Sequence, residues 1–103
     1  MIRRQLDLFQ AEQHDLLLRI AAAWQAYRRA GADEAEQRFG EYMDLVEEAE
    51  EELLALRERW AETMAAKERL RYVHEFTRAA EGRLPSLAAR RVYERTIDPD
   101  MEL

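Results

Sequence analysis

The sequence predicts an all-α protein: an antiparallel helical hairpin with a long second helix and a short third C-terminal helix, which assembles into a bundle or coiled coil. Turn residues are scarce, because the 103 residues include only three Gly and two Pro, too few to punctuate a many-stranded sandwich or barrel. Apolar residues recur at helical spacing along most of the chain. The length allows one domain, which we expect to span residues 1–97.

Residues 2–30 form the first predicted helix. One stripe carries its apolar side chains, with Gln13 as the only polar step, and its members are Leu6, Phe9, Leu16, Leu17, Ile20, Trp24 and Tyr27. Gly31 supplies the left-handed residue that commonly follows a helix end. The pair Asp33 and Glu36 resembles a capping box and starts the next helix almost at once. A connection this short makes the two helices antiparallel neighbours.

The second predicted helix covers residues 33–81, which contain no Pro and a single Gly. Its first part has a heptad stripe made of Tyr42, Val46, Ala49, Leu53, Leu56 and Trp60. Beyond Trp60 the apolar positions shift in register to Ala66, Leu70, Val73, Phe76 and Ala80. A shift of this kind predicts a change of supercoiling or of packing partner. Gly40 leaves two alternatives open, a bend or break of the helix, or room for the indole of Trp24.

Gly82 and Pro85 end the long helix. A short third helix is predicted over residues 85–96. Residues 98–103 are acidic, contain a proline and are expected to form a frayed tail.

The lengths of the predicted helices leave an apolar stripe uncovered. The first helix reaches along the second only to about residue 60 when the two pack antiparallel. The predicted interface therefore consists of Trp60, Met64, Leu70, Tyr72, Val73 and Phe76. A homo-oligomer, with a dimer favoured, would cover this stripe, and a heterologous protein partner would do so equally well. A monomer would require the long helix to fold back on itself or the stripe to stay open.

The charge is unevenly distributed along the chain, whose formal net charge is −6. Residues 33–52 contain ten acidic residues and one arginine, and the candidate acidic docking face is Glu47, Glu48, Glu50, Glu51 and Glu52. This block is either a solvated helix face, a docking surface for a basic partner, or one half of a self-association contact. The alternative function is a small regulator that binds nucleic acid through Arg83, Arg90, Arg91 and Arg95. The overall negative charge makes nucleic acid an improbable partner.

Catalytic and metal-binding patterns are missing from the sequence. The chain has no cysteine, which excludes disulfides, thiolate zinc sites and a cysteine nucleophile. His14 and His74 lack the Glu-x-x-His spacing of a di-metal bundle, and no glycine-rich loop could hold phosphate. We therefore expect a non-enzymatic protein-interaction or scaffold module without cofactor or metal, and a carboxylate metal-binding bundle is the third alternative. No apolar run approaches the roughly 20 residues of a membrane span, and we expect a cytoplasmic protein.

Overall fold

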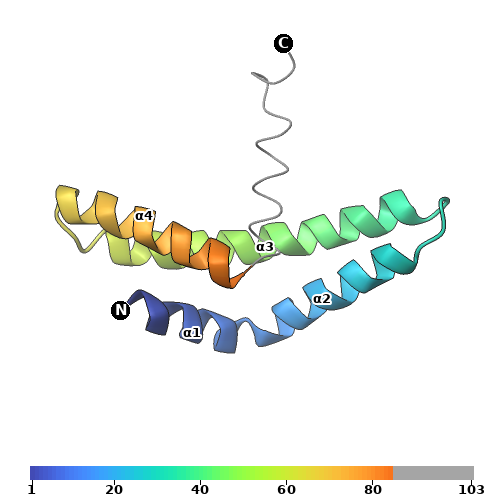
Figure 1. Cartoon of the computed structure of the whole chain (residues 1–103), viewed down its shortest axis with the longest axis horizontal. Coiled ribbons are helices and arrows are strands. Elements are labelled where there is room, and N and C mark those ends of the chain that lie inside the picture. The colour runs from blue at the N-terminus through green and yellow to red at the C-terminus, as the bar shows by residue number, and fades with distance from the viewer. Residues whose placement is uncertain (85–103) are drawn as a thin grey trace, which may run out of the picture.

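The computed structural model describes residues 1–84, and these form four helices with no strand among them (Figure 1). The helices are α1 (Ile2–Glu12), α2 (His14–Arg29), α3 (Ala35–Ala61) and α4 (Ala66–Arg83). The all-α class is therefore confirmed. The predicted helix 85–96 and the predicted tail 98–103 lie outside the described residues. None of the described helices is long and apolar enough to cross a membrane.

The antiparallel hairpin is formed by α2 and α3, and it is the most extensive helix pair of the fold. The chain leaves α2 because Ala30 takes an extended backbone conformation. The carbonyl of Gly31 then accepts hydrogen bonds from the amides of Glu34 and Ala35, which opens α3. The expected left-handed Gly31 is wrong, because no residue in the described part of the chain has a positive φ. No side chain caps α3, so the predicted capping pair is not formed either.

Four aromatic rings pack together at the end of this hairpin that lies next to the connection between α2 and α3. Trp24 and Tyr27 of α2 interleave with Phe39 and Tyr42 of α3, with ring centroids 5.0–6.1 Å apart. Contacts of this kind add about 0.5–1.5 kcal/mol per pair beyond the burial of area. The indole of Trp24 therefore packs against other aromatic rings and does not fill the space at Gly40 that one of the two alternatives predicted. α3 runs unbroken through Gly40, and a Cβ atom at this position would meet nothing within 4 Å.

The stretch predicted as one helix over 33–81 is two helices. α3 ends at Ala61, and α4 folds back along the C-terminal half of α3 after the turn at residues 62–65 (Figure 1). The turn needs no glycine or proline because the chain itself satisfies the free carbonyls at the end of α3. The Thr63 amide and hydroxyl both donate to the Trp60 carbonyl, and Arg69 Nε donates to the Ala61 carbonyl at 3.1 Å. The positive charge of Arg69 is also favourable at a helix C-terminus.

The first predicted helix, over residues 2–30, is also divided. α1 and α2 meet at Gln13, where the backbone leaves the helical conformation for one residue. The bend sends α1 away from the line of α2 and lays it beside α4 (Figure 1). Leu6 and Phe9 then become part of the core instead of extending the hairpin stripe.

The core is continuous along the molecule and draws on all four helices. Its fully buried apolar members are Leu6, Phe9, Leu16, Ile20, Tyr42, Val46, Ala49, Leu53, Leu56, Ala61, Tyr72, Phe76, Ala80 and Leu84. One end of the molecule is a two-helix arm, and the other end is a three-helix unit of α1, α4 and the end of α3 (Figure 1). The candidate site lies in the three-helix unit.

Candidate functional site

An apolar groove lies between α1 and the C-terminal end of α3, with a volume of about 610 Å³. We call it the α1/α3 groove, and it is lined by Met1, Arg4, Gln5, Leu8, Leu56 and Trp60. The lining positions on each helix are one turn apart, so they present one face to the groove. Its volume falls in the range of ordinary ligand-binding clefts.

Three of the largest apolar side chains of the groove remain open to solvent. Met1 is 62% exposed, Leu8 is 52% exposed and Trp60 is 43% exposed. Single exposed apolar side chains are common on protein surfaces, but a group of them around one depression is typical of an interaction site. Tryptophan is also among the residues that contribute most when a protein interface forms.

Gln5 is the polar side chain buried beneath this groove, with a relative exposure of 6%. The hydroxyl of Tyr72 donates a 2.7 Å hydrogen bond to Gln5 Oε1 and so ties α1 to α4. The other end of the amide, Nε2, is buried and has no hydrogen-bond partner within the described chain. An unsatisfied buried donor costs about 1–3 kcal/mol. Because Nε2 is shielded from solvent, this cost belongs to the packing between α1 and α4.

Tyr72 is the second buried polar group of this region. Burial of the phenol raises the pKa of Tyr72 above its ordinary value of 10.0. The hydroxyl therefore stays protonated at neutral pH and keeps donating to Gln5.

A second depression of about 510 Å³ lies between the start of α1 and α4. Its charged lining residues alternate in sign, with Arg3 and Arg71 beside Glu68 and Glu75. Met1 lines both depressions, and Met64 and Tyr72 line this one as well. Mixed charges of this kind select a partner less clearly than the α1/α3 groove does.

The structure separates the six residues predicted to form an interface. Trp60 and Leu70 are exposed, at 43% and 75%, and Met64 and Val73 are partly buried. Tyr72 and Phe76 are 4% and 1% exposed, so the prediction that they lie on an open stripe is wrong. The reason is the turn at residues 62–65, since α4 folds back and packs both side chains against the rest of the core.

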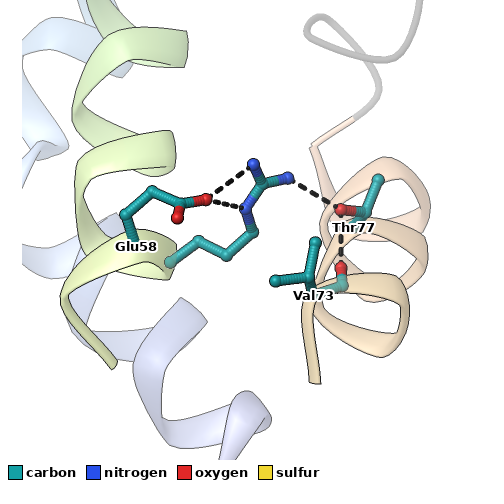
Figure 2. Close-up of polar contacts among 4 residues, drawn as sticks. Glu58, Val73 and Thr77 are labelled. Atoms are coloured by element: carbon teal, nitrogen blue, oxygen red, sulfur yellow. Dashed lines mark hydrogen bonds and ion pairs between the residues drawn. The ribbon is translucent and has the colours of Figure 1, made fainter. Parts of the chain in front are cut away.

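A polar contact fastens α3 to α4 on the side where the two helices face each other (Figure 2). Arg57 donates to Glu58 Oε1 from Nε and Nη2, at 3.0 and 2.9 Å, and to the Thr77 hydroxyl at 3.1 Å. Thr77 in turn donates to the Val73 carbonyl at 2.7 Å. The Arg57–Thr77 hydrogen bond crosses from α3 to α4, and the other bonds orient its two side chains, so the cluster serves the fold.

The predicted acidic docking face lies on α3. Glu47, Glu50 and Glu51 together with Leu54 line a shallow depression of about 260 Å³. Glu48 and Glu52 are exposed but do not line it. No group of three or more potential metal ligands occurs among residues 1–84.

Of the four arginines predicted to contact nucleic acid, only Arg83 lies in the described residues. Its guanidinium pairs with the Asp7 carboxylate and donates to the Arg3 carbonyl, so it joins the end of α4 to α1. Arg90, Arg91 and Arg95 lie outside the described residues. The structure therefore gives Arg83 a role in the fold.

Comparisons with protein-family models, with curated proteins and with solved structures found no match to this chain. The α1/α3 groove is thus the main guide to function. Sequence analysis selected Trp60 but missed the α1 residues of the groove. The sequence feature that could have pointed to the α1 residues was Gln5, a polar residue on the same face as Leu6 and Phe9.

Proposed function

We propose that the protein is a non-enzymatic helical interaction module that binds another protein chain in the α1/α3 groove. The observation that supports this function is the groove itself, where Met1, Leu8 and Trp60 stay half exposed around a buried, unpartnered amide donor. Covering these side chains would remove apolar surface from water, which is the main driving force of protein association. We place this activity in the cytoplasm, in keeping with a chain that contains no cysteine.

A second copy of the chain is one partner that would cover the groove. The homodimer expected from the sequence depended on a stripe that included Tyr72 and Phe76, and both are now internal. What remains for a dimer is the groove around Trp60. A symmetric contact of this kind would place the same groove of both copies against each other.

The proposal is tested by the molecular mass from light scattering across a concentration series, for the wild type and for Trp60→Ala. The matched control is Leu70→Ala, because Leu70 is 75% exposed and does not line the groove. A dimer that Trp60→Ala dissociates and Leu70→Ala preserves would support self-association. A monomer at every concentration would exclude a second copy as the partner, and a different protein would then have to fill the groove.

A further inference from the structure

The polar atoms that line the α1/α3 groove share one property. Arg4 carries only hydrogen-bond donors, and the indole N–H of Trp60 is also a donor only. Gln5 offers the groove no accessible polar atom of its amide, because Oε1 accepts from the Tyr72 hydroxyl and Nε2 is buried. No acidic side chain lines the groove. The lining therefore combines apolar surface with donors.

The groove carries a positive charge, because Arg4 is the one charged side chain among the described residues of its lining. Arg4 is exposed, and the structure shows no ion pair for it within residues 1–84. Neighbouring Asp7 pairs with Arg83 and so does not neutralise Arg4. A carboxylate is the group that best matches a guanidinium, since it accepts up to two parallel N–H hydrogen bonds.

We propose that the α1/α3 groove binds an acidic, apolar segment of a different protein, in which large apolar side chains alternate with Asp or Glu. The apolar side chains pack against Leu8, Leu56 and Trp60. A carboxylate of the segment pairs with Arg4. This inference rests on the proposed function and adds the chemistry of the partner.

The chemistry of the groove lining favours such a segment over a second copy of the chain. A second copy would bring its own groove, and two donor-only surfaces with exposed arginines repel each other. An acidic segment instead supplies a carboxylate for Arg4 and an acceptor for the indole N–H of Trp60. It also leaves the helices of the three-helix unit in place.

The test is a selection on the immobilised full chain from a phage-displayed library of random dodecapeptides, with counter-selection against Trp60→Ala. We expect the enriched peptides to contain Asp or Glu beside Leu, Ile, Met or Phe. The best peptide is then synthesised with a fluorescent label, and its affinity is measured by polarisation. Arg4→Gln should weaken binding about tenfold, because it removes a charge-assisted hydrogen bond.

The matched control for charge is Arg19→Gln, which removes an exposed arginine of α2 that does not line the groove. It should change the affinity less than about twofold. The second variant is Leu8→Ala, which removes half-exposed apolar surface from the groove. It should weaken binding several-fold, and circular dichroism of the same sample checks that the helices remain.

The outcomes separate this inference from the proposed function. Enriched peptides that are basic or uncharged, with binding that still depends on Trp60, would overturn the inference and leave the interaction module standing. A concentration-dependent dimer that Trp60→Ala dissociates, without enrichment of acidic peptides, would identify a second copy as the occupant and also overturn it. No enrichment that depends on Trp60, together with a monomer at every concentration, would overturn both.

Discussion

Replacing Phe76 by alanine tests whether α4 folds back onto the rest of the chain. Phe76 is 1% exposed in the core, and its ring lies 5.7 Å from that of Tyr72. Truncating a buried phenylalanine costs about 3–5 kcal/mol. We expect the lower end, about 3 kcal/mol, because the three-helix unit is small and its side chains can partly close the cavity. A chain of this size has about 5–15 kcal/mol of total stability, so the loss would be about a fifth or more.

The assay is urea unfolding followed by the helical signal in circular dichroism, at two protein concentrations. Leu70→Ala is the matched control, because Leu70 is 75% exposed on the same helix and its loss should change the free energy of unfolding by less than about 0.5 kcal/mol. If Phe76→Ala prevents folding, Phe76→Leu provides a smaller cavity at the same position. Equal effects at Phe76 and Leu70 would refute the fold-back. So would a wild-type midpoint that rises with concentration while Phe76→Ala abolishes the rise, because that would place Phe76 between chains.

Three further predictions concern the helices and their connections. Gly40→Ala should raise the free energy of unfolding by about 0.5–1 kcal/mol in the same urea assay, because alanine favours the helix and a Cβ meets no atom within 4 Å; an unchanged or lower value would contradict this. Tyr72→Phe should cost about 1 kcal/mol at neutral pH, through loss of the hydrogen bond to Gln5. Because the pKa of Tyr72 is raised in the folded state, the contribution of this group to stability should be constant below about pH 10 and fall above it, and Tyr72→Phe should reduce the alkaline loss of stability; identical alkaline profiles would contradict the buried phenol. A double-mutant cycle on Asp7→Asn and Arg83→Ala should give a coupling of at most about 1 kcal/mol that shrinks with salt, since both side chains are partly exposed; a larger, salt-independent coupling would show a buried pair.

The hairpin could be predicted from the sequence because its signals are local and agree with one another. The stripe Tyr42, Val46, Ala49, Leu53 and Leu56 is buried in α3, as the heptad spacing requires. The short connection after residue 30 then fixes α2 and α3 as antiparallel neighbours. Both the helical period and the loop length are properties of a short stretch of chain, so one sequence is enough to determine them.

The break between α3 and α4 could not be predicted in the same way, because its stabilising contacts come from the following helix. Arg69 donates to the Ala61 and Met64 carbonyls only after the chain has turned. An arginine inside a helical pattern carries no sign of this role, and glycine and proline are absent from the turn. The register shift after Trp60 was the available signal. It marks the place where the chain stops packing on α2 and begins to pack on α1 and back on α3.

The exposure of Trp60 follows from this same turn. Along α3 the stripe residues before Trp60 are covered by neighbouring helices, whereas Trp60 stands one residue before the helix ends at Ala61. α4 turns back over Ala61, which is fully buried and small enough to allow the close approach. The indole is left in the groove beside α1, where Met1, Leu8 and Trp60 itself all stay partly exposed. The turn that closes the core over Phe76 therefore also creates the open groove, and a substitution that straightens the turn should abolish both.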